Sequence, residues 1–174
     1  MLRLGIHLGE YSVRLAKPGD EARLQALLVS DPDYFKVIQG APARSTEAKH
    51  QLSDLPGGKK YDDKFVYVIF DRDDVLAALI DLVRAYPDDE TWFLGLLFVA
   101  PASRNMGLGT RLLDAIFAEI KQQGGRAIRL GVDRGNVRAR ALYDRIGFHF
   151  IYERERVYPN GFTATIDVLE CPLY

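Results

Sequence analysis

Residues 97–110, which read LFVAPASRNMGLGT, decide the fold of this chain. Apolar residues typical of a buried strand lead through a loop with two glycines, Gly107 and Gly109, into a helical pattern. A helix start exposes unpaired N–H groups and the positive end of the helix dipole, and glycine lets an anion approach the backbone closely. The stretch therefore predicts a cradle for a phosphate or pyrophosphate group at a strand-to-helix junction.

Two glycines alone are a weak signal, because a tight helix start packed against a strand has the same pattern. Two better-defined phosphate motifs do not fit this sequence. The Gly-x-x-x-x-Gly-Lys-Ser/Thr pattern of a P-loop is absent, and the three-glycine dinucleotide fingerprint is incomplete. The phosphate cradle is therefore of another kind, if the glycines form one.

The rest of the chain surrounds this stretch with alternating strand and helix patterns. Three neighbouring strand patterns, at 65–70, 75–86 and 91–99, are joined by short turns and predict an antiparallel meander. Further strands are expected at 13–16, 126–133, 148–157 and 163–172, the last two joined by a hairpin at Asn160-Gly161. Helices are expected from Asp20 to about Ser30, at about 45–54, from 108 to about 123, and from Asn136 to Gly147.

Residues 31–63 are the least regular part, and Asp31-Pro32-Asp33 is read as a turn or loop. The predicted order is β-α-α-β-β-β-α-β-α-β-β. A meander followed by a β-α-β crossover describes an α/β fold, in which helices cover a mixed sheet.

Composition bounds the kind of protein. The 174 residues fit one domain, expected over 1–174, and 48% of them are hydrophobic. A net charge of −1 argues against nucleic acid or an anionic membrane as a partner, and no apolar stretch is long enough to span a bilayer. The single Cys171 excludes an internal disulfide and a Cys-rich zinc site. We therefore expect no metal and a reducing, cytoplasmic location.

The small net charge hides an uneven distribution. Residues 100–145 hold nine basic and four acidic residues, a net charge of +5, which leaves −6 for the rest of the chain. The excess is either a chance fluctuation or a local site for a small anionic ligand.

A second cluster, residues 136–148 with the sequence NVRARALYDRIGF, follows a predicted strand. Asn136 and Tyr143 are seven residues apart, nearly two helical turns, so both lie on one face of the helix. The pair could line a ligand cleft. Equally, Asn136 could only cap the helix and Tyr143 could only pack against its neighbours.

These two clusters together resemble a known family. Arg104-x-x-Gly107-x-Gly109 is similar to the cofactor motif of the GNAT-type N-acetyltransferases. The run from Asn136 through Ala139 and Leu142-Tyr143 to Gly147-Phe148 resembles the second signature of the same superfamily. The resemblance covers residues 12–172 in element order and is specific over about 90–150. It implies a GNAT fold, with a mostly antiparallel sheet of about seven strands and about four helices.

The resemblance also implies acetyl-CoA as co-substrate, bound where the fourth and fifth strands splay apart. Leu97 N–H would polarise the acetyl carbonyl, and the backbone of Val99 would pair with the pantetheine arm. Tyr143 would be the general acid for the departing thiolate, which suits a phenol because it stays protonated at neutral pH. The cofactor-binding residues implied are Leu97, Phe98, Val99, Arg104, Asn105, Met106, Gly107, Leu108, Gly109, Thr110, Asn136 and Tyr143.

The general base is left open by the sequence. Some members of the family carry a glutamate partway along the fourth strand, and Phe93 stands at that position here, by the register from the glycine motif. The candidates that remain are Asp81 and Glu90, and also His149 and Glu153.

The acceptor is expected to be a primary amine, on a small molecule or a peptide, and the protein a monomer or homodimer. Residues 31–63 and 158–162 match the variable acceptor-binding regions of the family. Their aromatic residues could wall a pocket: Tyr34, Phe35, Tyr61, Tyr158 and Phe162.

Two other functions are weighed against an acetyltransferase. One is a non-catalytic acyl-CoA-binding or regulatory module with the same fold, which Phe93 in place of a carboxylate keeps open. The other is nucleic-acid binding through the arginines, which the acidic remainder of the chain disfavours.

Overall fold

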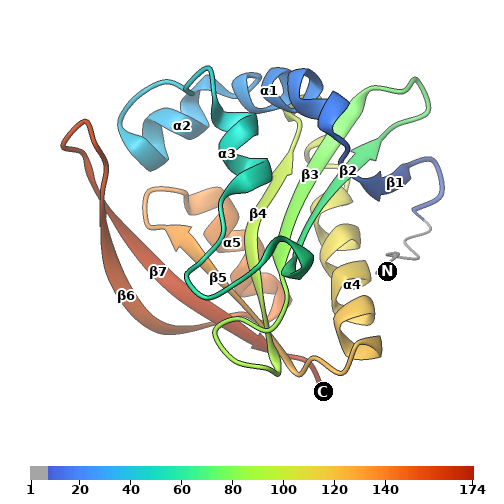
Figure 1. Ribbon diagram of the computed structural model, residues 1–174, viewed down its shortest axis with the longest axis vertical. Helices are drawn as coiled ribbons and strands as arrows, with labels where there is room; N and C mark the ends of the chain where they lie inside the picture. Colours follow the sequence, from blue (N-terminus) through green and yellow to red (C-terminus); the bar gives the residue numbers. More distant parts are fainter. Residues whose placement is uncertain (1–7) are drawn as a thin grey trace.

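The computed structural model describes residues 8–174, which form one seven-stranded sheet with helices on both faces (Figure 1). The strand order is β1-β2-β3-β4-β5-β7-β6, and all neighbours are antiparallel except β4 and β5. This is the mixed, mostly antiparallel sheet that the sequence predicts. The strands are β1 (Ser12–Leu15), β2 (Lys64–Phe70), β3 (Leu76–Val83), β4 (Thr91–Val99), β5 (Ala127–Asp133), β6 (His149–Val157) and β7 (Thr163–Pro172).

The helices divide between the two faces of the sheet because each buries one apolar stripe. The helices α4 (Leu108–Gln122) and α5 (Val137–Ile146) pack on one face, where Leu112, Ile116 and Ile120 are fully buried. The other face is covered by α1 (Glu21–Val29), α2 (Pro32–Gln39) and α3 (Glu47–Ser53). Alternating residues of each central strand feed both cores, so the sheet is buried on both sides.

The helix α2 is absent from the predicted order, so the prediction of a loop at Asp31-Pro32-Asp33 is wrong. Asp31 is its N-cap and accepts a hydrogen bond from Tyr34 N at 3.1 Å, and Pro32 occupies the first helical position. Both are favourable helix-start features that also occur in turns. Gly40 ends the helix with φ of 66°. The region before the meander therefore holds three helices instead of two.

The parallel pair β4 and β5 separates partway along its length. Register holds from Thr91↔Ala127 to Leu94↔Leu130, and no pairing follows between these two strands. Beyond that point β4 continues through five more residues to Val99, and β5 continues to Asp133 on its other partner, β7. The sheet therefore opens into a V between the carboxyl ends of two central strands.

The hairpin between β6 and β7 forms as predicted. Gly161 adopts φ of 82°, and Tyr158 N donates to Phe162 O at 2.8 Å. Asn160 Nδ2 reaches across to Gln39 O at 3.0 Å, so the hairpin tip is held against the end of α2. Within residues 8–174, no helix has the length and apolar character needed to cross a bilayer.

Candidate functional site

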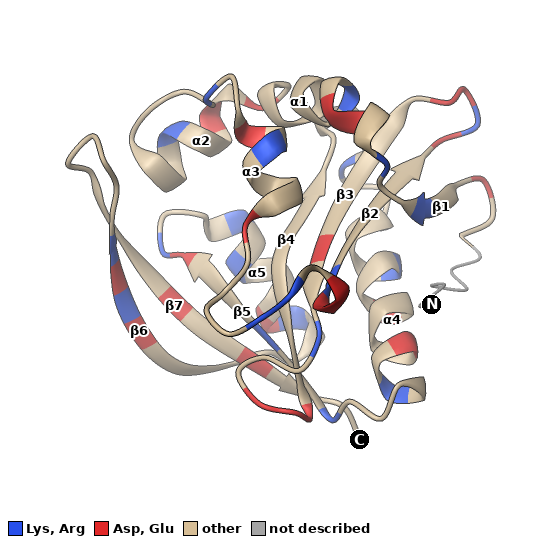
Figure 2. Cartoon of the chain, viewed as in Figure 1, with Lys and Arg blue, Asp and Glu red and all other residues tan. Residues whose placement is uncertain are grey.

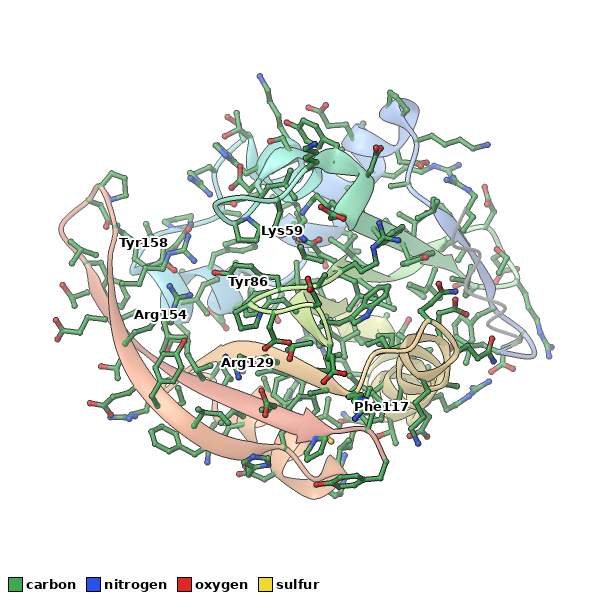
Figure 3. The ribbon with its side chains drawn as sticks, turned by 60° about the horizontal axis from the view of Figure 1, so that its bottom comes forward. Lys59, Tyr86, Phe117, Arg129, Arg154 and Tyr158 are labelled. Atoms are coloured by element: carbon green, nitrogen blue, oxygen red, sulfur yellow. The ribbon has the colours of Figure 1, made fainter. Side chains whose placement is uncertain are left out.

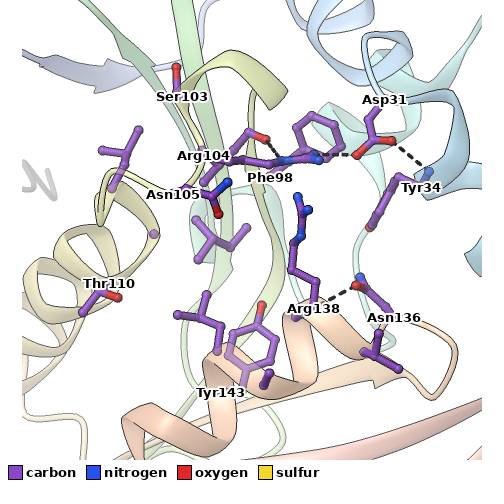
Figure 4. A pocket seen from close by; sticks show the side chains of 18 of the residues that line it. Asp31, Tyr34, Phe98, Ser103, Arg104, Asn105, Thr110, Asn136, Arg138 and Tyr143 are labelled. Carbon is purple, nitrogen blue, oxygen red and sulfur yellow. Dashed lines mark hydrogen bonds and ion pairs between the residues drawn. The ribbon is translucent and has the colours of Figure 1, made fainter.

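A cavity of about 670 Å³ lies where β4 and β5 part (Figure 4). Its walls come from β4, the loop after β4, the start of α4, α5 and the two residues before it, and α2. These segments are far apart in sequence, and they meet because the parallel pair ends early. The residues that the sequence assigns to the cofactor lie in this wall, apart from Met106: Leu97, Phe98, Val99, Arg104, Asn105, Gly107, Leu108, Gly109, Thr110, Asn136 and Tyr143. Met106 is an exposed residue of the same loop.

The backbone of Leu97 and Val99 faces the opening. Phe98 lies opposite Leu79 of β3, and Ala100 N donates to Ala77 O at 2.8 Å. Backbone groups of an antiparallel strand alternate in direction, so Leu97 and Val99 point away from β3 toward the gap. The β5 register has already ended at Leu94, so no strand covers these two N–H groups.

The loop after β4 brings further backbone N–H groups to the same cavity. Gly107 is the N-cap of α4 with φ of 74°, a left-handed conformation that suits glycine. The first helical bond runs from Arg111 N to Gly107 O, so the N–H groups of Leu108, Gly109 and Thr110 precede the hydrogen-bonded turns. These N–H groups, together with the positive end of the helix dipole, are suited to bind an anion.

Arg104 connects this loop to β4 and α2. Its Nε donates to Val99 O at 2.9 Å, and its guanidinium pairs with Asp31 at 2.6 Å and lies 5.7 Å from the centre of the Phe98 ring. Burial opposes ionisation of Asp31, but Arg104 and the backbone N–H groups outweigh it and hold the pKa of this carboxyl below its usual value. The N-terminus of α2 is thereby fixed to the loop after β4.

Tyr143 reaches the cavity from α5. The side chain is buried, its ring packs edge-on to Phe148 at 5.3 Å, and its hydroxyl points into the pocket (Figure 4). Burial raises the pKa of this phenol, so the hydroxyl keeps its proton throughout the neutral range. A protonated donor at the edge of the gap can serve as a general acid.

Asn136 combines both roles that the sequence left open. Its Oδ1 accepts a hydrogen bond from Ala139 N at 3.2 Å and so caps α5. The residue also lines the cavity. The cap explains why an asparagine begins this helix, and the cavity places the same side chain beside Tyr143.

A smaller cavity of about 70 Å³ continues from the gap toward α2. Tyr143, Asn136 and Tyr34 line both cavities. The smaller one also contains Asp133, the last residue of β5, which the sequence analysis did not single out. The strand pattern could have indicated which way Asp133 faces. It follows the buried Val132 by one residue, so it faces the opposite side of the sheet, where α2 lies.

The three carboxylates and the imidazole proposed as bases lie outside both cavities. Asp81 is buried in β3, where Lys64 at 2.8 Å and Gln51 at 2.5 Å hold it. Glu90 precedes β4 at the far end of that strand and pairs with Arg126. His149 is exposed on β6, and Glu153 on the same strand pairs with Arg134. None of them is placed to take a proton from a group bound in the gap.

Phe93, the position that resembles the family glutamate, is also remote from the opening. It lies in the paired part of β4 opposite Val83 and Arg129, and its ring contacts that of Tyr86 at 5.6 Å. Nearer the gap, a side chain at Gly95 would collide with Asp81, because an added Cβ would lie 2.9 Å from the carboxylate. A glycine is therefore required there, and β4 presents no acid to the cavity.

Most arginines of residues 100–145 form ion pairs with carboxylates. Basic and acidic residues lie on the same elements in Figure 2, as on α4 and β6. Six of the eight arginines in residues 100–145 are paired: Arg104, Arg111, Arg126, Arg129, Arg134 and Arg140. Arg138 and Arg145 remain, and both line the large cavity. Within the part of the chain that the structure describes, neither of these two takes part in an ion pair.

The aromatic residues expected around the acceptor separate into three groups. Tyr34 lies in the cavity wall, and Tyr158 and Phe162 form a ring pair, 6.1 Å apart, in the hairpin opposite α2 (Figure 3). Phe35 is part of the core, and Tyr61 is exposed on the surface. Of these five aromatic residues, Tyr34 lines the two cavities at the gap.

Comparison with known proteins relates this chain to a protein family. The sequence model of the Acetyltransferase (GNAT) family matches residues 29–148. This range contains the whole of the gap, from α2 through α5.

Two characterised relatives and one solved structure illustrate the similarity. The mycothiol acetyltransferase of Beutenbergia cavernae is 28% identical over 160 residues, which are 82% of this chain and 54% of that protein, so the chain spans about half of its length. The [ribosomal protein bS18]-alanine N-acetyltransferase of Haemophilus ducreyi is 32% identical over 136 residues, 78% of this chain and 88% of that protein. An acetyltransferase structure from Thermus thermophilus superimposes with a TM-score of 0.73 at 21% identity, covering 96% and 99% of the two chains.

Proposed function

The chain belongs to the GNAT acetyltransferase family, and on that premise we propose that it transfers an acetyl group from acetyl-CoA to a primary amine by direct attack in a ternary complex. The observation that carries this proposal is the early end of the β4–β5 pair, with the open N–H groups of Leu97 and Val99 and the hydroxyl of Tyr143 on one cavity. This cavity has a volume of about 670 Å³, and the second cavity that reaches the gap has about 70 Å³.

The cavity fits the chemistry of a coenzyme A thioester. Its mouth offers the N–H groups at the start of α4 and the guanidinium groups of Arg138 and Arg145 to phosphates. Its floor offers the edge of β4, where an extended amide-containing arm can add to the sheet at Val99 as a further strand would. Gly109 lines the same cavity, and an added Cβ there would meet only the Leu142 and Val99 side chains, at 3.5 and 4.0 Å.

Acetyl-CoA, when bound, supplies an activated acetyl group and a thiolate leaving group. Leu97 N–H donates to the acetyl oxygen and stabilises the negative charge that develops there as the amine attacks. Tyr143 donates its proton to the sulfur, which a hydroxyl with a raised pKa can do across the neutral range.

The acceptor approaches from the α2 side of the sheet. That side is walled by Tyr34 and by the β6–β7 hairpin, which Asn160 holds against α2. The H. ducreyi relative acts on the alanine of a protein, as its name states, and a peptide amine would also fit this open groove. We therefore include a peptide N-terminus beside small amines among the acceptors.

The experiment that tests the proposal is a free-thiol release assay with acetyl-CoA over a panel of primary amines. The panel contains an amino acid, an amino sugar, a polyamine and a short peptide with an N-terminal alanine. We expect amine-dependent thiol release together with the acetylated amine, identified by mass spectrometry. Binding of acetyl-CoA without release for any amine contradicts the enzyme assignment and favours a non-catalytic acyl-CoA-binding module.

A further inference from the structure

Asp133 has no cationic partner, in contrast to the three buried aspartates of the described chain. Asp20 pairs with Arg14, Asp81 with Lys64, and Asp167 with both Arg134 and Arg140. Unpaired carboxylates are costly away from water and are uncommon there. Among residues 8–174, Asp133 is a carboxylate in the wall of the gap with no ion pair of its own.

The two oxygens of Asp133 have different environments. Oδ1 accepts a hydrogen bond from Gly135 N at 2.8 Å, which fixes the carboxylate at the turn between β5 and α5. Oδ2 is shielded from solvent and has no hydrogen-bond partner in the described structure. A buried acceptor without a donor calls for a ligand that provides one.

The surroundings of Asp133 place this oxygen on the acceptor side of the reaction centre. The 70 Å³ cavity that it lines is larger than one water needs and leads to Tyr143. Ionisable groups face it from each element packed around it. They are Tyr34 on α2, Tyr143 on α5, Tyr158 in the hairpin, and Asp167 on β7, which Arg134 and Arg140 neutralise.

We propose that Asp133 is the catalytic residue that binds the incoming amine and takes its proton. This inference rests on the proposed acetyl transfer and adds the base that the sequence did not identify. Oδ2 accepts an N–H of the ammonium group inside the small cavity, opposite the Leu97 N–H that faces the gap from β4. Burial raises the pKa of Asp133, which makes its carboxylate a stronger base than an ordinary aspartate.

The proton count balances. An ammonium acceptor, R–NH₃⁺, loses one proton to Oδ2 and becomes a neutral amine. The nitrogen attacks the thioester carbonyl, so the C–N bond forms and the C–S bond breaks. Tyr143 gives its proton to the sulfur and regains one from the nitrogen, which leaves one N–H in the amide. Asp133 then releases its proton to water, so each turnover yields amide, free thiol and one proton.

The same assignment predicts a preference for amines that are cationic in solution. A carboxylate without a counter-ion attracts an ammonium group before chemistry begins. A free amine of pKa near 10.4 is mostly protonated at pH 7, so both binding and deprotonation depend on this oxygen.

The test is the pH profile of kcat/KM for Asp133→Asn, measured with the fastest amine of the panel. Asparagine keeps an oxygen for Gly135 N and removes only the basic oxygen, so folding and acetyl-CoA binding should match the wild type. We expect kcat/KM to fall on the order of 100-fold at pH 7. The deficit should shrink as the pH approaches the pKa of the amine, because the neutral amine no longer needs a base. The matched control is Asp62→Asn, which neutralises an exposed aspartate outside both cavities.

Each outcome is decisive. A loss at pH 7 that shrinks with rising pH, with unchanged acetyl-CoA binding, supports the role of Asp133. Wild-type activity in Asp133→Asn overturns the role of Asp133, and so does a loss of activity that is the same at every pH. In both cases the proposed acetyl transfer is unaffected. If the wild type releases no thiol with any amine, the proposed function fails and the role of Asp133 fails with it.

Discussion

At the scale of single residues, the site depends on a few groups that the gap brings together. The seven-residue spacing of Asn136 and Tyr143 places both on the cavity wall, which is one of the two alternatives that the sequence left open. The proposed role of Asp133 could not be predicted from its strand position alone, because that role depends on an unpaired carboxylate oxygen beside a cavity. An aspartate at the end of a strand looks the same in sequence whether it is paired or not.

Tyr143→Phe tests the general acid. Phenylalanine preserves the ring that packs on Phe148 and removes the hydroxyl, so we expect the fold and the acetyl-CoA dissociation constant to be unchanged. The value of kcat should fall by roughly 100-fold or more. Tyr61→Phe, at an exposed tyrosine outside the cavities, provides the matched control in steady-state assays. An unchanged kcat in Tyr143→Phe would remove the hydroxyl from the mechanism.

At the scale of elements, the start of α4 is the part that the sequence predicted most directly. Strand, loop, left-handed glycine and helix follow each other within residues 97–110, so local pattern is sufficient to identify them. Helix α2 was missed because the same Asp-Pro-Asp run can begin a turn or a helix. The choice is made by distant partners: the Asp31–Arg104 pair, and Phe35 in the core between α1 and the sheet.

Gly107→Ala tests the anion-binding helix start. A Cβ at φ of 74° is strained by about 1–2 kcal/mol, and nothing within 4 Å crowds it, so the effect is a backbone effect. We expect the free energy of unfolding to fall by about 1 kcal/mol and the acetyl-CoA dissociation constant to rise roughly tenfold. Chemical denaturation and titration calorimetry measure the two quantities.

Gly57→Ala is the matched control for that substitution. Gly57 also has nothing within 4 Å of an added Cβ, but it lies in a surface loop outside both cavities and does not have a left-handed φ. If Gly107→Ala binds acetyl-CoA as tightly as the control does, the start of α4 does not hold the phosphates.

At the scale of the whole molecule, the site is a consequence of topology. Strand β5 is paired with β7 along the full length of β5, while it is paired with β4 over only four residues, so the sheet opens between β4 and β5. Apart from α2, the order of elements was predictable from the sequence, because the other helices and strands have clear apolar patterns or turn signals. The charge pattern was less informative, since six of the eight arginines in residues 100–145 serve ion pairs and only Arg138 and Arg145 face the cavity unpaired in the described structure.

The central claim is that the thioester lies against β4 in this opening, and amide hydrogen exchange measures it residue by residue. In the free protein the N–H groups of Leu97 and Val99 face the gap, so they should exchange faster than those of the fully paired strand β3. With saturating acetyl-CoA, we predict that Leu97, Val99 and the first turn of α4 become protected, while β3 does not change. Unaltered exchange at Leu97 and Val99, with protection elsewhere in the chain, would contradict the account.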